Sequence, residues 1–249
     1  MRRTPAAAAV ESVPQRHPEP SGAASGPRSR LVWAMLAIFA VAFAVRLTCL
    51  AQLASAPTFL EPVSDSAGYH DKARALVDGA PLTATFFYQA TGYPFFLAAL
   101  YRLGGDSIVV AKVAQCALGA LVCALVVLLG ARWFDRRTGL TAGFALALYG
   151  PLVFFETELL PAGLAAALAV LLLLALDGAR RASSPWPFTA LGLSAAAAVV
   201  TRPTFVPFVG AALGWLAVAR WRGGMARRSA VAAVVAAALR MAAVWLPLA

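Results

Sequence analysis

The chain has 249 residues, of which 61% are hydrophobic and only 13% are charged, and its mean hydropathy is +0.76. A soluble domain carries about 25% charged residues, so this composition excludes a soluble globular protein and indicates an integral membrane protein. The net charge of +10 does not indicate a nucleic-acid partner, because the basic residues stand in short clusters between apolar runs.

Residues 1–30 are rich in Arg, Pro, Ala, Gly and Ser and show no apolar periodicity, which predicts a disordered cytoplasmic tail. The apolar run that follows is too long for a secretory signal and lacks a cleavage site, so we interpret it as an uncleaved first span. We expect the rest of the chain, residues 31–249, to form one transmembrane domain.

The remaining apolar runs predict an all-α polytopic membrane protein with about seven transmembrane helices, since each span needs roughly 20 apolar residues. The predicted spans are 31–53, 108–130, 138–155, 158–177, 187–201, 203–219 and 229–249. We expect a break between the fifth and sixth spans at Thr201-Arg202-Pro203. The segment 92–103 is apolar but only about half a span long, so we expect it to lie in the interface or to dip into the membrane from the outer side.

The distribution of basic residues predicts the orientation of these spans. If the N-terminus is cytoplasmic, every basic cluster between spans falls on the cytoplasmic side, at 132–137, 180–181 and 220–228. The first large loop, 54–107, then faces out.

This outer loop is the longest polar segment after the tail, and Asp65 opens a helical pattern in it that ends at Gly79. Asp65 has two open roles, a helix N-cap and a catalytic group. The pattern predicts that Lys72 and Arg74 belong to the solvated face of this helix, with a second option of contact with an anionic headgroup. We expect the tyrosines of the loop, Tyr69 and Tyr93 among them, to form an interfacial belt or to contact a sugar ring.

Three further polar groups fall on the same outer side, so we expect Asp65, Glu156, Glu158 and Arg202 to converge there. The simpler interpretations are that the positive end of the next helix's dipole stabilises the two glutamates, and that the Arg202 side chain extends to the membrane interface. A guanidinium beside exposed backbone N–H groups also suits a phosphate. Arg46 lies within an apolar run and is expected to face the protein interior.

Five segments, in this order, resemble a known family: SDSAGYHDKARALVDG, FFYQATGYPFFLAALYRLGG, AKVAQCALGAL, ALYGPLVFFETELLP and GLSAAAAVVTRP. The pattern is similar to that of the GT-C glycosyltransferases, in the bacterial branch that includes dolichyl-phosphate-mannose–protein mannosyltransferases and aminoarabinose transferases. The resemblance covers residues 31–210, most of the chain.

The resemblance implies inverting transfer of a hexose or pentose from a polyprenyl-phosphate donor to a lipid, glycan or protein acceptor. The reaction would take place at the outer face of the bacterial inner membrane. By motif, Asp65 corresponds to the general base, Glu156 or Glu158 to a second carboxylate, and Arg202 to a group near the donor phosphate. The predicted catalytic residues are Asp65 and Glu156, and the predicted substrate-binding residues are Arg202, Lys72, Arg74, Glu158, Tyr69 and Tyr93.

Some members of this family bind a divalent cation, Mg²⁺ or Mn²⁺, near these acids, which makes Asp65 and Glu156 the candidate metal ligands. Many members have two adjacent acids in the first loop, whereas Ser66 follows Asp65 here, which weakens the case for a metal. Members usually have more spans, so we expect this chain to be truncated at its C-terminus.

Two other functions remain open. A transporter or flippase for a lipid-linked sugar would require polar groups near mid-membrane and internally repeated halves. A non-catalytic membrane subunit is the second alternative.

Overall fold

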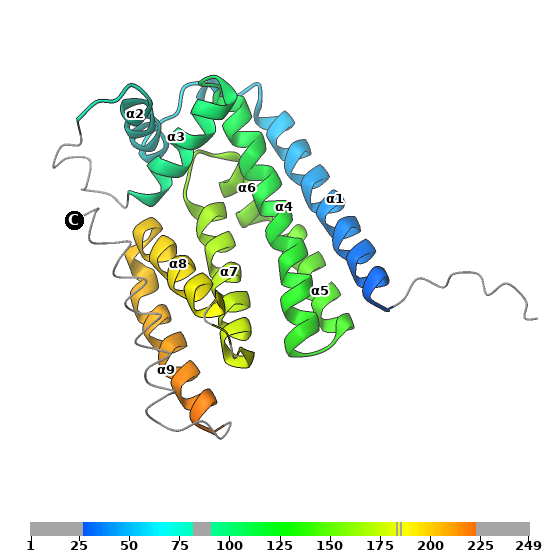
Figure 1. Ribbon diagram of the computed structural model, residues 1–249. Helices are drawn as coiled ribbons and strands as arrows, with labels where there is room; N and C mark the ends of the chain where they lie inside the picture. Colours follow the sequence, from blue (N-terminus) through cyan, green and yellow to red (C-terminus); the bar gives the residue numbers. More distant parts are fainter. Residues whose placement is uncertain (1–26, 82–90, 183, 185, 223–249) are drawn as a thin grey trace, which may run out of the picture.

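The computed structural model describes residues 27–81, 91–182, 184 and 186–222, and every regular element in these parts is a helix. The prediction of an all-α protein is therefore confirmed. Figure 1 shows the helices as an elongated bundle. They are α1 (Pro27–Leu53), η1 (Pro57–Phe59), α2 (Asp65–Val77), α3 (Gly92–Gly104), α4 (Ile108–Trp133), α5 (Arg136–Ala147), α6 (Gly150–Thr157), α7 (Ala162–Arg181), α8 (Trp186–Thr201), η3 (Pro203–Phe205) and α9 (Val206–Arg222).

Within the described residues, four helical segments are long and apolar enough to cross a membrane, and a fifth is added if α5 and α6 count as one bent span. The four are α1, α4, α7 and the continuous pair η3–α9, which correspond to the first, second, fourth and sixth predicted spans. The predicted fifth span is the shorter apolar helix α8. The predicted span 229–249 and most of the predicted tail lie outside the described residues. A polytopic membrane protein is confirmed, with fewer complete spans in the described part than the seven predicted.

The predicted third span, 138–155, is wrong as a single helix. Helix α5 ends at Ala147, α6 begins at Gly150, and their axes differ by 53°. Pro151 in the first turn of α6 has no backbone N–H to donate to the preceding turn, and its ring would clash with the carbonyl four residues earlier, so α5 cannot run through this point. Glu156 therefore lies in a short helix rather than in a turn.

Small residues set the contact between α4 and α5. A Cβ atom added at Gly139 would lie 2.4 Å from the backbone oxygen of Val127, and one added at Gly143 would lie 2.4 Å from the Val127 side chain. Glycines four residues apart share one helix face and allow two backbones in lipid to approach closely. The Asp135 side chain caps α5 by accepting a hydrogen bond from the Thr138 N–H at 2.9 Å. The result is a tight helical hairpin.

The helices form two groups, with α1, α5 and α6 packed around α4 and with α8 and α9 packed on α7. Contact between α4 and α7 joins the groups. Helices α2 and α3 lie at one end of the bundle, and the start of α1 and the α4–α5 turn lie at the other (Figure 1). The short apolar helix predicted at 92–103 is α3, which packs on α2, α4 and α8.

Candidate active site

Three of the predicted site residues line one pocket of about 370 Å³. Asp65 and Tyr69 come from α2, where residues four apart share a face, and Arg202 comes from the break after α8. The rest of the lining comes from α6, from the α6–α7 connection and from the first residue of α7, at Phe155, Leu160, Pro161 and Ala162. The fold thus brings a carboxylate, Asp65, and a guanidinium, Arg202, to one cavity from distant parts of the chain.

Asp65 is the first residue of α2, not its N-cap. The N-cap is Ser64, whose φ of 56° is unusual for a residue with a side chain and which makes no side-chain capping bond. The capping role considered for Asp65 is therefore wrong. The predicted end of the helix is confirmed, because α2 ends at Val77 and Gly79 adopts a φ of 71°. Among the described residues, neither Asp65 nor Arg202 belongs to an ion pair, so both charges are available to a ligand.

Arg202 takes its position from the proline that follows it. Its backbone is extended, with φ −149° and ψ 111°, because Pro203 disfavours helical geometry in the preceding residue. Helix α8 therefore ends at Thr201, and the chain restarts as η3 with Pro203 in its first turn. The predicted break is confirmed, and it leaves the exposed Arg202 side chain at the pocket.

The charges around Tyr69 show how close these groups are. Burial raises the pKa of the Tyr69 phenol, the Asp65 carboxylate raises this pKa further, and the Arg202 guanidinium opposes the shift. Tyr69 consequently remains a neutral hydroxyl, able to donate or accept a hydrogen bond beside an anion and a cation.

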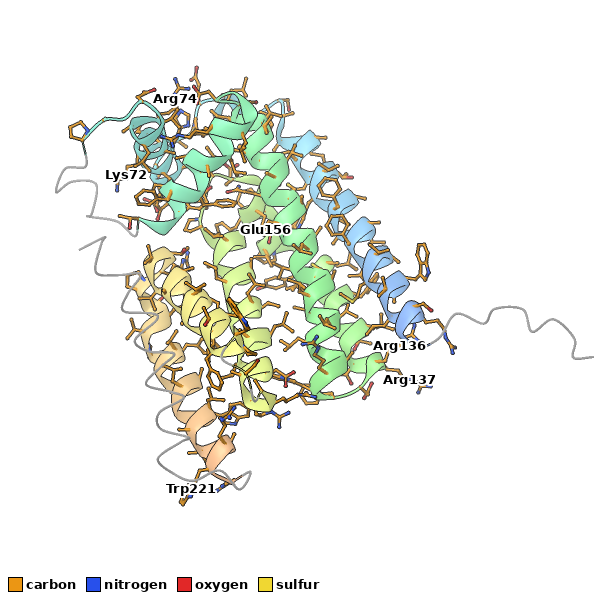
Figure 2. All side chains as sticks on the ribbon, viewed as in Figure 1. Lys72, Arg74, Arg136, Arg137, Glu156 and Trp221 are labelled. Atoms are coloured by element: carbon orange, nitrogen blue, oxygen red, sulfur yellow. The ribbon has the colours of Figure 1, made fainter. Side chains whose placement is uncertain are left out.

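The other predicted substrate-binding residues do not line this pocket. Lys72 and Arg74 lie on α2, at the same end of the bundle as the pocket (Figure 2). The Arg74 guanidinium forms an ion pair with Asp106 at 3.3 Å. Burial lowers the pKa of the Lys72 ammonium. Glu158 lies 3.6 Å from the Lys112 ammonium, and Tyr93 is fully buried. Tyr93 is thus part of the core and not of the predicted interfacial belt.

Glu156 lies inside the bundle (Figure 2) and does not line the pocket. The Nε of Arg46 on α1 donates a hydrogen bond to its Oε2 at 2.5 Å, and both side chains are fully buried. Arg46 therefore faces the protein interior, as predicted. Gly119 and Gly163 leave room for this carboxylate, since a Cβ at Gly119 would lie 2.2 Å from Oε2 and one at Gly163 would lie 2.9 Å from Cγ.

A buried polar network holds the backbone behind the pocket wall. The Nε2 of Gln115 donates to the backbone carbonyls of Glu158 at 2.8 Å and of Glu156 at 3.3 Å, and its Oε1 accepts from the Tyr93 hydroxyl. The connection that begins at Glu158 supplies Leu160 and Pro161 to the pocket. The network therefore holds the backbone that leads into this wall, and it gives the buried Tyr93 hydroxyl a hydrogen-bond partner.

Sequence reasoning did not single out Gln115 or Lys112. The available signal is two polar residues three positions apart in an apolar span, where they share one face and ionisable groups point into the protein. Both are buried on α4.

The candidate metal ligands do not form a cation site. Asp65 lines the pocket, while Glu156 is buried against Arg46, and its Oε1 has no hydrogen-bond partner within the described residues. Mg²⁺ is commonly bound by one or two carboxylates, with waters and substrate phosphate oxygens completing its coordination. No group of three His, Cys, Asp or Glu side chains suited to a metal occurs in the part of the chain that the structure describes. Asp65 and Glu156 therefore do not bind one cation together in this arrangement, and a cation at Asp65 stays a prediction.

An apolar groove of about 450 Å³ lies beside the polar pocket. It is formed by α3, α7 and α8, and Thr201, one of its lining residues, directly precedes Arg202. The remaining lining residues are Gly92, Phe95, Phe96, Leu164, Leu168, Leu193, Ala197 and Val200. A charged pocket next to an apolar groove in a membrane protein is suited to an amphiphile with an anionic group.

These features define a polytopic membrane protein with a charged pocket beside an apolar groove, and its family is shown by comparison with known families. The family model described as dolichyl-phosphate-mannose-protein mannosyltransferase matches residues 89–247, more than half of the chain. The chain belongs to this family and is a membrane glycosyltransferase of the GT-C superfamily. Comparisons with curated proteins and with solved structures give no match.

The family match includes the α6–α7 wall and Arg202 but begins after Asp65 and Tyr69. The resemblance to the GT-C superfamily is thus confirmed, while the narrower bacterial branch stays a prediction. The family implies a lipid-linked sugar donor and an acceptor.

Proposed function

We propose that the protein transfers a hexose or pentose from a polyprenyl-phosphate donor to an acceptor hydroxyl, with inversion at the anomeric carbon. The observation that carries this proposal is the single pocket lined by Asp65, Tyr69 and Arg202. It places a carboxylate and a guanidinium around a space within the size range of small-molecule sites.

In the proposed reaction, Asp65 is the general base and accepts the proton of the acceptor hydroxyl. The acceptor oxygen attacks the anomeric carbon as the bond from that carbon to the phosphate oxygen breaks. The electron pair of this bond leaves with the polyprenyl phosphate. Arg202 binds the phosphate and stabilises its developing charge, for which a planar guanidinium is well suited. Tyr69 donates a hydrogen bond to a sugar or phosphate oxygen.

The apolar groove supports a lipid donor rather than a nucleotide donor. Its lining is almost entirely hydrocarbon, and it adjoins the residue proposed to bind phosphate. An isoprenoid chain in this groove would place its phosphate at Arg202 and its sugar toward Asp65. The close approach of Gly92 to Thr201 shapes this junction, because a Cβ at Gly92 would lie 2.6 Å from the Thr201 hydroxyl oxygen.

We propose that the pocket faces the non-cytoplasmic side of a bacterial inner membrane. The pocket helix α2 lies at the opposite end of the bundle from Arg136 and Arg137 (Figure 2), and basic ends of membrane proteins are cytoplasmic. Acidic and aromatic groups of the pocket then contact an acceptor glycan, lipid or protein at the non-cytoplasmic face of this membrane.

The test is the release of polyprenyl phosphate from a labelled polyprenyl-phosphate sugar by purified protein in lipid nanodiscs. Asp65→Asn keeps the size of the side chain and removes the base, so we expect the rate to fall by about 10²–10⁴-fold. Asp71→Asn is the matched control, because Asp71 is an exposed acid on the same helix that does not line the pocket. We expect this control to retain the wild-type rate.

The alternatives give different results in the same assay. If the wild-type protein binds the donor but releases no polyprenyl phosphate with any acceptor tested, the result would favour a non-catalytic subunit. Movement of intact donor between the leaflets of a vesicle would favour a flippase. Asp65→Asn protein that inserts normally and transfers sugar at the wild-type rate would falsify the assignment of the base.

A further inference from the structure

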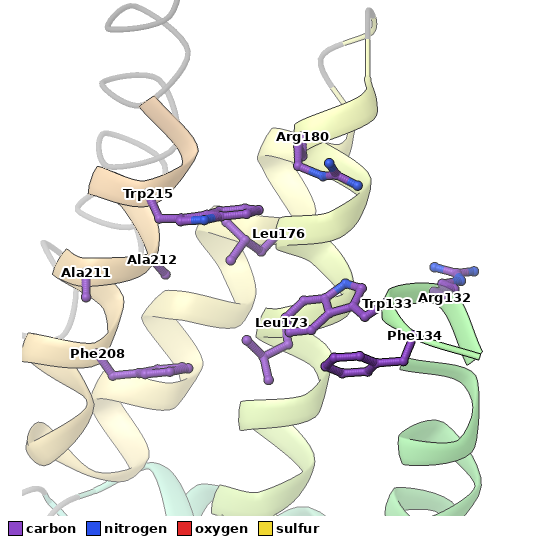
Figure 3. Close-up of a pocket in the computed structure, with 10 residues that line it drawn as sticks. All are labelled: Arg132, Trp133, Phe134, Leu173, Leu176, Arg180, Phe208, Ala211, Ala212 and Trp215. Atoms are coloured by element: carbon purple, nitrogen blue, oxygen red, sulfur yellow. The ribbon is translucent and has the colours of Figure 1, made fainter. Parts of the chain in front are cut away.

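A second cavity, of about 510 Å³, lies far from the active-site pocket along the bundle. Figure 3 shows its lining, which comes from the end of α4, from the last half of α7 and from one face of α9. Helix α7 packs on both α4 and α9 and supplies the back of the cavity. The α4–α5 turn and the C-terminal ends of α7 and α9 belong to the basic end of the molecule, which the proposed reaction does not use.

The walls of this cavity are apolar and aromatic. Phe208, Ala211, Ala212 and Trp215 recur at the spacing of a single helix face on α9. Leu173 and Leu176 from α7, together with Trp133 and Phe134 at the end of α4, complete the walls. Large side chains here remain open to the surroundings, with Phe134 73% exposed and Trp215 47% exposed. Such a surface suits a hydrocarbon chain, and tryptophans are typical of the depth at which headgroups begin.

Two arginines bring positive charge to the same cavity. Figure 3 shows the Arg180 and Arg132 side chains away from Phe208, at the end of the cavity where α4 and α7 terminate. Arg180 lies 3.5 Å from Asp177, but this carboxylate is closer to Arg181, at 2.9 Å. One acid is therefore shared between two arginines, and the cavity keeps a net positive charge.

We propose that this cavity binds a bilayer phospholipid with an anionic headgroup, such as a phosphatidylglycerol. An acyl chain lies between α7 and α9 against Leu173, Phe208 and Trp215, and the phosphate lies between Arg132 and Arg180. Basic cavities between transmembrane helices commonly bind anionic headgroups in this way. Two guanidiniums match a phosphate that has no neutralising ammonium group better than they match a zwitterionic headgroup.

The positive charge of the cavity also favours an anionic lipid over two other occupants, the C-terminal segment of this chain and a second copy of the chain. Residues 223–249 of the chain contain three arginines and no acidic residue, so this segment does not complement Arg132 and Arg180. A second copy of the chain would bring another basic end to this one. An anionic lipid matches both the apolar walls and the charge.

The two tryptophans of the cavity provide a direct test. Full-length protein is reconstituted in phosphatidylcholine vesicles that contain brominated phosphatidylglycerol or, at the same mole fraction, brominated phosphatidylcholine. Bromine on the acyl chain quenches nearby tryptophan fluorescence, so quenching that is lost in a Trp133→Phe/Trp215→Phe variant reports this cavity. We expect a preference for phosphatidylglycerol of up to about thirtyfold, from two arginines near the membrane surface.

Arg132→Gln/Arg180→Gln should abolish this preference while acyl-chain quenching by either lipid persists. The matched control is Arg137→Gln/Arg222→Gln, which removes the same charge from exposed positions that do not line the cavity. We expect the control to keep the preference.

Three results would overturn the proposal. They are equal quenching by the two lipids in wild-type protein, an equal loss of preference in the control variant, and a preference that survives in the tryptophan variant. A variant that fails to fold is recognised by its far-UV circular dichroism, and Arg132→Lys/Arg180→Lys then provides the comparison, since it should retain the preference. All these measurements are independent of sugar transfer.

Discussion

Glu156 shows how one distant partner decides the role of an acidic residue. Its position between the predicted spans 138–155 and 158–177 favoured a surface carboxylate at the active site. In the structure it is buried against Arg46, a residue more than one hundred positions away in the chain. A carboxylate and a guanidinium in this environment stabilise each other, and removal of one leaves an uncompensated buried charge.

This pair gives a prediction for stability. Arg46→Met should lower the free energy of unfolding by about 3–5 kcal/mol, because it leaves the Glu156 carboxylate buried without its cation. Arg46→Met/Glu156→Met should recover most of that loss, since it removes both charges together. Thermal unfolding of the detergent-solubilised protein, followed by tryptophan fluorescence, measures both variants. A double variant as unstable as the single one would show that the pair does not act as a unit.

At the scale of elements, α2 is held in place by few polar contacts. The Nδ1 of His70 lies 2.7 Å from the Tyr101 hydroxyl on α3, and the Arg102 guanidinium donates to the Leu76 carbonyl at 3.0 Å. Arg74 pairs with Asp106 just after α3. Since α2 carries Asp65 and Tyr69, these contacts determine how the pocket is closed on this side.

His70 makes this docking dependent on pH. Burial lowers the pKa of His70 below its usual 6.5, and Arg74 also lowers it, while Asp71 and Asp106 oppose the shift. The folded protein thus binds the proton less strongly than the unfolded chain. The contribution to stability is complete above pH 6.5 and is lost as the pH falls through the lowered pKa.

We therefore expect the melting temperature to decrease as the pH falls from about 7.5 to about 5.5, around the usual histidine pKa of ~6.5. His70→Gln keeps a polar side chain near Tyr101 but does not titrate, so it should remove this part of the pH dependence. Hydrogen exchange of α2 at the two pH values localises the effect. An unchanged pH profile in His70→Gln protein would assign it to other groups.

The elements that sequence predicted well are those with local signals. The start of α2 follows from the helical pattern that Asp65 opens, while its end before Gly79 and the break before Pro203 follow from glycine and proline chemistry. The kink at Gly150-Pro151 had the same kind of signal, but an apolar run of span length concealed it. The burial of Tyr93 and Glu156 had no local signal, because it depends on Gln115 and Arg46 from other helices.

At the scale of the whole molecule, the clusters of basic residues at the α4–α5 turn and at the C-terminal ends of α7 and α9 lie at the end of the bundle opposite to α2 (Figure 1). This arrangement predicts the topology, and cysteine labelling tests it. In a Cys49→Ser background, where Cys116 and Cys123 are buried, Asp78→Cys should react with a membrane-impermeant maleimide on intact cells. Arg137→Cys should react only after the membrane is permeabilised. The reverse pattern would place the pocket in the cytoplasm.

The two ends of the bundle are proposed to bind different lipids. The groove beside Arg202 is proposed for the donor, and the basic cavity at the other end is proposed for a bilayer lipid. The groove and the basic cavity share only α7 among the helices that line them. Changes at Arg132 and Arg180 should therefore leave the donor site intact.

The central claim is that Asp65 and Arg202 act on one bound lipid-linked sugar. The most direct test measures donor binding and polyprenyl-phosphate release in parallel for Asp65→Asn and Arg202→Gln protein. We predict that Asp65→Asn binds the donor as tightly as the wild type but releases product about 10²–10⁴-fold more slowly, and that Arg202→Gln binds the donor more weakly. Wild-type release by Asp65→Asn, or unchanged donor affinity and release in Arg202→Gln, would contradict the account.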